Sequence, residues 1–198
     1  MGTKIAVFAS GSGSNFQAIQ EAISRGELNA TIELVITDKP GAYVVTRAQN
    51  FGIPVMELAP KIFADKAAYE AKLVELLKER EIEWIILAGY MRLVGETLLS
   101  AYEHRIINIH PSLLPSFPGK DAIGQAMTHG VKVTGVTVHY VDAGMDTGKI
   151  ISQGAVDVVD GNREATEERI HKLEHALYTK TLQQLFIAKK VNSHEPLL

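Results

Sequence analysis

The residues with the most suggestive chemistry lie in the segment Asn108-Ile109-His110-Pro111-Ser112-Leu113-Leu114-Pro115. The amide of Asn108 could donate a hydrogen bond to an oxyanion, and the imidazole of His110 belongs to the residue type that titrates near neutral pH. These two groups suit a reaction of the acyl-transfer type. The alternative interpretation of an Asn-x-His pair is a polar strand end whose groups are satisfied by a neighbouring loop.

A carboxylate that could join this pair is Asp146, in the glycine-containing loop from Asp142 to Gly148. Such a loop can bring a carboxylate close to a ligand or a histidine, although an isolated Asp in a loop is more often a turn former. His139 shares a strand face with Thr137, because side chains two apart in a strand point the same way. It is either an outer residue of the same site or a satisfied structural histidine.

The element that must position Asn108 and His110 is the short apolar run Arg105-Ile106-Ile107, which is typical of a strand buried in a parallel sheet. Pro111 and Pro115 stop any regular continuation, because each proline fixes φ and removes a backbone donor. The strand period of two therefore points both side chains beyond the carboxyl end of the sheet, where open α/β sheets bind ligands.

A second candidate site is the loop Ser10-Gly11-Ser12-Gly13-Ser14-Asn15, between the buried run 4–9 and a helix marked by Phe16, Ile19 and Ile23. Free amides at a helix N-terminus are a ready anion site. The loop lacks the Lys of a Walker A motif and, at Phe16, the third glycine of a dinucleotide fingerprint. The alternative is a plain strand-to-helix turn in which Ser14 or Asn15 caps the helix.

The remaining pattern predicts one domain, residues 1–198, with a doubly wound, Rossmann-like and mostly parallel α/β sheet. The run 131–140 alternates and should be half-exposed, and its short return to 149–153 predicts an added antiparallel hairpin. A long C-terminal helix should follow, and the tail 191–198 should be loosely held. Strands are expected at 4–9, 32–37, 53–56 (towards an edge), 84–88 and 105–107, and helices at 43–50, from a cap at Asp65, at 122–129 and at 163–189.

Composition narrows the class of protein. The chain has 198 residues, of which 46% are hydrophobic and 22% charged, which suits one globular domain. A formal net charge of −3 gives no basic surface for nucleic acid, and the lack of cysteine excludes disulfides and thiolate catalysis. No signal peptide fits the start, and no apolar run reaches the ~20 residues of a membrane span. We therefore expect a cytoplasmic protein without a membrane or nucleic-acid partner.

The long C-terminal helix carries further polar candidates. Glu174 lies at the edge of its buried stripe and needs a partner, either a substrate or a structural Lys or Arg. His171 and His175 have the i, i+4 spacing of a metal pair, but no third ligand is evident. A solvated helix face is the favoured interpretation, so no metal is expected.

Taken together, these segments resemble the folate-dependent phosphoribosylglycinamide formyltransferases. They occur in the order of that family and span nearly the whole chain. The Asn-x-His-Pro-Ser-Leu-Leu-Pro segment is shared with other formyl-transfer enzymes, whereas its combination with Gly-Ser-Asn and the C-terminal Glu-His is specific. The matching segments are Ala9–Asn15, Leu87–Arg92, Asn108–Pro115, Gly135–His139, Asp142–Gly148 and Glu174–Ala176.

The resemblance implies two small-molecule substrates, a phosphoribosylglycinamide and the formyl donor 10-formyltetrahydrofolate. The N-terminal half would bind the ribotide, and the C-terminal half would bind the folate and carry out catalysis. Asn108 and protonated His110 would donate to the tetrahedral oxyanion, and Asp146 would pair with His110 and relay a proton through a water. The ribotide would be held by Gly13, Ser14, Asn15 and Glu174, and the folate by Lys66, Met91, Arg92, Leu93, Val94, Asn108, Asp142, Ala143, Gly144 and Met145.

The chain departs from the family at two positions, and three other functions compete. Lys66 replaces an Arg that some members use for the donor and cannot form its bidentate fork. Lys149 replaces a proline. Methionyl-tRNA formyltransferase would need a C-terminal tRNA-binding domain, and formyltetrahydrofolate hydrolase an extra N-terminal domain. A nucleotide-sensing Rossmann domain could use Asp38 for a ribose, but would leave Asn108 and His110 unexplained. A homodimer is compatible with the sequence.

Overall fold

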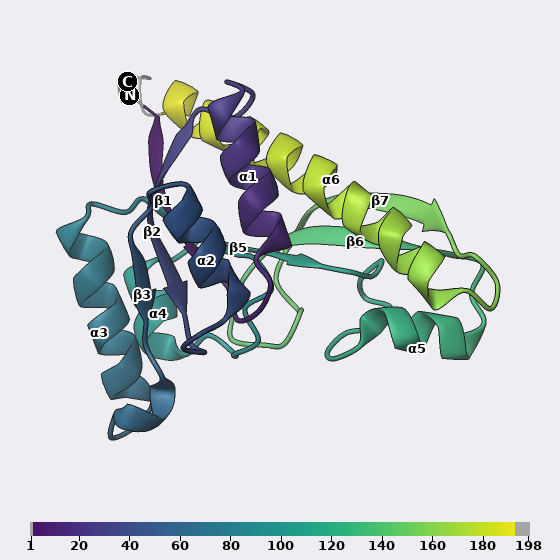
Figure 1. Cartoon of the computed structure of the whole chain (residues 1–198), viewed down its shortest axis with the longest axis horizontal. Coiled ribbons are helices and arrows are strands. Elements are labelled where there is room, and N and C mark those ends of the chain that lie inside the picture. Colours follow the sequence, from purple (N-terminus) through teal and green to yellow (C-terminus); the bar gives the residue numbers. More distant parts are fainter. Residues whose placement is uncertain (1, 193–198) are drawn as a thin grey trace.

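The computed structural model describes residues 2–192, so residues 193–198 of the expected loose tail lie outside the described part of the chain. Seven strands form one sheet in the order β3-β2-β1-β4-β5-β6-β7 (Figure 1). β1 to β5 are parallel, and β5, β6 and β7 pair antiparallel. The strands are β1 (Thr3–Phe8), β2 (Ala30–Thr37), β3 (Val55–Glu57), β4 (Trp84–Leu87), β5 (Ile106–His110), β6 (Val133–Tyr140) and β7 (Ile150–Asp157).

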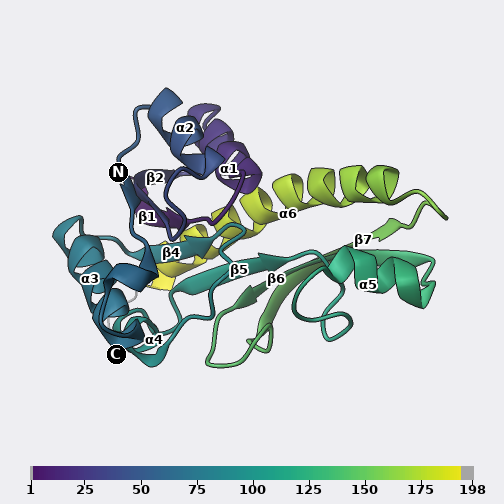
Figure 2. The same cartoon turned by 60° about the horizontal axis from the view of Figure 1, so that its bottom comes forward.

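Helices cover both faces of the sheet, as a doubly wound fold requires (Figures 1 and 2). One core cluster joins β1 and β4 to buried residues of α1, α2 and α6, and a second joins the sheet to α3 and α4. None of the helices within residues 2–192 is long and apolar enough to cross a membrane. The helices are α1 (Ser14–Ser24), α2 (Tyr43–Asn50), the 3-10 turn η1 (Pro60–Ile62), α3 (Lys66–Glu79), α4 (Glu96–Ala101), α5 (Ala122–His129) and α6 (Arg163–Asn192).

Local sequence signals account for some of these boundaries. The Asp65 carboxylate accepts a hydrogen bond of 2.8 Å from the Ala68 amide and so caps α3, as expected. The stripe of α3 that faces the sheet is buried at Tyr69, Leu73, Leu76 and Leu77. β3 is an edge strand, which suits the proline that precedes it.

The expectation that residues 131–140 would be half-exposed is wrong, because β6 is buried on both faces from Thr134 to His139. Val136 and Val138 pack into the core that α6 covers. On the opposite face the chain after β5 folds back over the strand. There the Thr137 hydroxyl donates to the Ser112 carbonyl at 2.7 Å and accepts from the Leu114 amide at 3.0 Å. The Thr137 hydroxyl therefore faces polar backbone rather than water.

The sheet order reverses between β1 and β4, since the chain moves outward through β2 and β3 and then returns to the other side of β1. The connections that leave the carboxyl ends of β1 and β4 diverge at this point. In open α/β sheets such a switch point opens a crevice for ligands. The expected loop after β1 and the expected segment after β4 both begin there.

Candidate active site

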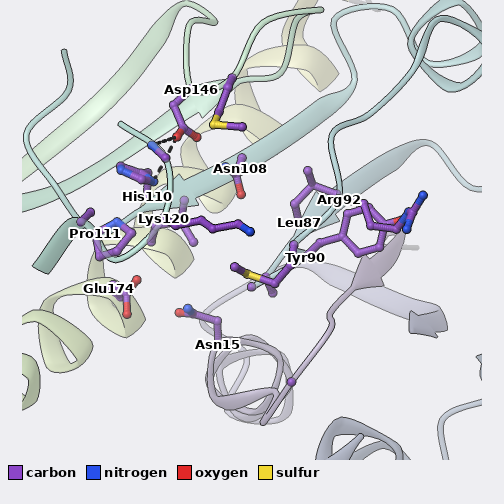
Figure 3. A pocket seen from close by; sticks show the side chains of 18 of the residues that line it. Asn15, Leu87, Tyr90, Arg92, Asn108, His110, Pro111, Lys120, Asp146 and Glu174 are labelled. Carbon is purple, nitrogen blue, oxygen red and sulfur yellow. Dashed lines mark hydrogen bonds and ion pairs between the residues drawn. The ribbon is translucent and has the colours of Figure 1, made fainter. Parts of the chain in front are cut away.

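One cavity of about 410 Å³ opens at the carboxyl ends of β1, β4 and β5. The loop before α1, the segment after β4, the end of β5, the loop before α5, the loop around Asp146 and one face of α6 line it. In Figure 3, Glu174 and Arg92 lie on opposite sides of this cavity, Asn108 lies between them, and His110 lies above Glu174, next to Asp146. The structure therefore brings the two sites that the sequence suggested separately into one space.

His110 is buried, with 6% of its surface exposed, and both of its ring nitrogens have defined neighbours. Nε2 lies 2.9 Å from the Phe117 carbonyl oxygen, which can only accept, so Nε2 carries a proton. Nδ1 then faces the Asp146 carboxylate, whose Oδ2 atom is 3.5 Å away (Figure 3). The same Oδ2 accepts from the Gly119 amide at 2.8 Å, which fixes the carboxylate.

Asn108 is held by the strand that pairs with it. Asn108 and His139 are direct partners in the β5–β6 register, and the amide Nδ2 lies 3.3 Å from His139 Nε2. His139 Nδ1 donates to the Tyr140 carbonyl at 2.8 Å, and burial lowers the pKa of this imidazole. Neutral His139 therefore presents Nε2 as an acceptor, which orients the Asn108 amide. The second N–H of the amide is left for a ligand.

The loop before α1 has the geometry of an anion site. Gly13 adopts a left-handed conformation (φ 76°) as the N-cap of α1, and no side chain caps this helix. The alternative of a turn capped by Ser14 or Asn15 is therefore wrong. The amides of the first turn remain donors that lack a side-chain partner, as an anion ligand requires. Gly13, Ser14 and Asn15 all line the cavity.

Glu174 lies on α6 at the same end of the cavity and is buried, with 5% of its surface exposed. Its Oε2 atom lies 2.8 Å from His171 Nδ1, and this hydrogen bond raises the pKa of His171. His171 lines the cavity too, which the expectation of a solvated helix face missed. The i, i+3 spacing of the two residues was the signal that could have found it. Within residues 2–192, no cluster of three or more His, Asp or Glu side chains could hold a metal.

The segments that the resemblance assigned to a folate only partly line the cavity. Met91, Arg92, Leu93, Val94, Gly144 and Met145 do so. Asp142 instead accepts from the Gly144 amide and the Thr147 hydroxyl, which makes it a turn former, and Ala143 lies beside it outside the lining. Lys66 is exposed in the first turn of α3 and does not line the cavity.

Asp38, the residue that a nucleotide-sensing domain would offer to a ribose, has a different partner. It is buried and accepts a hydrogen bond of 2.6 Å from the Ser10 hydroxyl. Ser10 Oγ in turn accepts from the Met91 amide at 2.9 Å. The carboxylate therefore ties the end of β1 to the cavity wall after β4 and is not presented to a ligand. This arrangement removes the support for the nucleotide-sensing alternative.

The doubly wound sheet and a cavity that combines an amide donor, a buried His–Asp pair and an anion loop define an α/β transferase of the acyl type. A sequence profile described as formyl transferase matches residues 3–182. The chain therefore belongs to the formyl transferase family.

Individual relatives agree with this assignment. The phosphoribosylglycinamide formyltransferase of Bacillus subtilis (strain 168) is 54% identical over 183 residues, which cover 92% of this chain and 94% of that protein. The crystal structure of glycinamide ribonucleotide transformylase 1 from Geobacillus kaustophilus is 57% identical, with a TM-score of 0.91, and the match covers 94% of this chain and 100% of that chain. The trifunctional purine biosynthetic protein adenosine-3 of Drosophila melanogaster is 41% identical over 185 residues, 92% of this chain and 14% of that protein.

Proposed function

We propose that this chain transfers the formyl group of 10-formyltetrahydrofolate to the amine of 5′-phosphoribosylglycinamide, giving formylglycinamide ribotide and tetrahydrofolate in de novo purine biosynthesis. The observation that carries the proposal is the single cavity that places an anion loop, an oxyanion donor and an apolar wall in one space. A phosphorylated acceptor and a donor with a largely apolar ring system can then meet at Asn108 and His110.

The ribotide occupies the end of the cavity between α1 and α6. Its phosphate lies at the amides of Gly13, Ser14 and Asn15, where the helix dipole and free N–H groups favour negative charge. The buried Glu174 carboxylate binds the sugar hydroxyls or the amine. The pair that Glu174 forms with His171 supports this role, because it holds the carboxylate in one orientation at the cavity wall.

The folate occupies the opposite end, against the segment after β4. Met91 and Met145 are 61% and 55% exposed there, and both line the cavity together with the exposed Leu93. A contiguous exposed apolar wall of this kind marks a ligand-binding groove. Arg92, Leu93, Val94 and Gly144 complete this wall. Apolar side chains around a few polar groups suit a pteridine ring.

The reaction takes place between these two ends, where Asn108 Nδ2 and His110 Nδ1 are the available donors. The ribotide amine attacks the formyl carbon, and the carbonyl oxygen becomes an oxyanion. Asn108 Nδ2 and the protonated Nδ1 of His110 donate to this oxyanion. Collapse of the intermediate breaks the bond to the folate nitrogen. The proton lost by the amine passes to that nitrogen through Asp146 and a water.

Residues 1–198 form one formyltransferase domain in this proposal, and the enzyme acts in the cytoplasm. The experiment that tests the proposal incubates the protein with a radiolabelled formyl donor, with and without the glycinamide ribotide. We expect labelled formylglycinamide ribotide only when the ribotide is present. Label released as formate at equal rates in both samples would indicate a hydrolase and overturn the proposal.

A further inference from the structure

Arg47, near the end of α2, contacts the anion loop without lining the cavity itself. Its Nε atom donates to the Ser12 carbonyl at 2.7 Å, and its NH1 atom donates to Gln17 Oε1 at 2.7 Å. The guanidinium also lies over the ring of Tyr43, 4.9 Å from its centroid. Arg47 is therefore fixed on one side by its own helix and on the other by the loop and by α1.

α2 contacts the loop at two further points. The Val44 amide donates to the Gly11 carbonyl at 3.1 Å. A Cβ atom on Gly13 would lie 2.6 Å from Val44 Cγ2, so α2 packs directly against the position where the loop becomes left-handed. Two successive carbonyls of the loop, those of Gly11 and Ser12, are thus held towards α2.

The direction of these carbonyls decides the direction of the amides. In a trans peptide the C=O and the following N–H point to opposite sides. When Arg47 and Val44 hold the carbonyls of Ser12 and Gly11, the amides of Gly13 and Ser12 are turned away from α2. Gly11, Ser12 and Gly13 all line the cavity, so these amides face the anion position.

The charge of Arg47 adds to this arrangement. Among residues 2–192, no carboxylate lies within 4.0 Å of its guanidinium, whereas Arg25 and Arg163 both form such pairs. The positive charge next to the loop is therefore not cancelled by an ion pair. Arg47 is only partly exposed and its guanidinium borders the loop, so its charge would attract an anion bound there as well as fix the geometry of the loop.

We propose that Arg47 is a positioning residue for the phosphate of the ribotide. It orients the Ser12–Gly13 peptide and supplies an uncompensated charge, without touching the substrate. The inference rests on the proposed function, because it assigns a residue to the phosphate end of that site. It also makes α2 a part of the ribotide site, although this helix lies outside the cavity.

Kinetics with the purified chain test the role. Arg47→Ala should raise the KM for the ribotide about 10- to 100-fold, the range expected when a charge-assisted hydrogen bond is lost. The KM for the formyl donor and kcat at saturating ribotide should stay unchanged. Arg47→Lys keeps the charge and should recover part of the loss, and Arg47→Gln, which keeps only a neutral donor, should recover less at low salt. Arg25→Ala, which removes an exposed arginine paired with Glu27, is the matched control and should change neither KM.

A second measurement needs no turnover. Inorganic phosphate is titrated into the wild type and into Arg47→Ala, and the NMR shifts of the amides of residues 11–15 are followed. We expect saturable shifts in the wild type and binding weakened by the same factor as the ribotide KM in the variant. If the wild type fails to transfer formyl groups but shows this difference, the proposed function fails and the role of Arg47 stands. An unchanged phosphate affinity in the variant, no loop shifts in the wild type, or an equal rise of both KM values would overturn the inference.

Discussion

His139 Nε2 lies 3.3 Å from Asn108 Nδ2, across a strand pair in which the two residues are direct partners. The pair joins the expected oxyanion donor to an imidazole that burial keeps neutral. Because neutral His139 donates through Nδ1 to a backbone carbonyl, only its Nε2 lone pair can meet the amide. The orientation of the Asn108 side chain is therefore set by the antiparallel strand β6, which carries His139, and not by β5 alone.

The first prediction concerns the pH dependence of His139. Its pKa is lowered in the folded state, so near and below the ordinary histidine value of about 6.5 the unfolded chain binds more protons. The free energy of unfolding should therefore fall as the pH decreases through this window. His139→Gln keeps an acceptor for Asn108 but cannot titrate. Urea unfolding should show that the free energy of unfolding decreases less between pH 7 and pH 5.5 in the variant than in the wild type. Part of the pH dependence that remains in the variant comes from His175, because burial also lowers the pKa of this histidine. Equal slopes would show that His139 is not held neutral.

The second prediction concerns the two donors to the oxyanion. Asn108→Ala should lower kcat by about 10²–10³, the usual cost of losing one such donor. His110→Ala should cost at least as much, and the double variant should lose less than the product of the two factors, since both act on one charge. Steady-state kinetics of the three variants measure this. Fully multiplicative losses would indicate separate roles.

The third prediction concerns the pair of Glu174 and His171. The hydrogen bond that His171 Nδ1 donates to the Glu174 carboxylate raises the pKa of His171. The contribution of this pair to stability is therefore fully present below the ordinary histidine value and is lost as the pH rises through the raised value. Glu174→Gln should lower the pKa of His171, as followed by NMR. It should also raise the KM for the ribotide while the donor KM stays constant. A large drop in melting temperature with normal ribotide KM would assign Glu174 a structural role instead.

The fourth prediction uses two glycines with the same backbone conformation. Gly13 and Gly26 have φ of 76° and 77°, but an added Cβ meets Val44 only at Gly13 and open space at Gly26. Gly13→Ala should raise the KM for the ribotide strongly and leave donor binding intact. Gly26→Ala carries the same backbone strain without the collision, so it should lower the melting temperature but leave both KM values unchanged. Equal effects on the two substrates at position 13 would indicate a collapsed turn.

Much of the fold and the centre of the site could be predicted, because their signals are local. Apolar runs marked the strands, Asp65 marked the start of α3, and the period of two placed Asn108 and His110 on one side of β5. The pairing of Asn108 with His139 could not be derived, since it depends on the register between β5 and β6.

The predictions that were wrong also depended on contacts between segments that are distant in the sequence. The burial of β6 depends on a segment that folds back over it from more than 20 residues away. The N-cap of α1 is the left-handed Gly13, which has no side chain, and Val44 of α2 leaves no room for a Cβ atom at this position. His171 joins the site because α6 forms a wall of the cavity that the end of β5 also lines. These features are tertiary, and local patterns do not contain them.

Asp146→Asn tests most directly whether the Asp146 carboxylate and His110 act together in formyl transfer. The amide keeps an oxygen for the Gly119 amide but removes the charge that faces His110 Nδ1 at 3.5 Å. With both substrates bound at saturation, we predict that the single-turnover rate of transfer from a labelled formyl donor falls by about 10²–10⁴, the range of general acid–base catalysis, while both dissociation constants stay within about twofold. A single-turnover rate equal to that of the wild type, with both substrates bound, would remove Asp146 from the site and contradict the account.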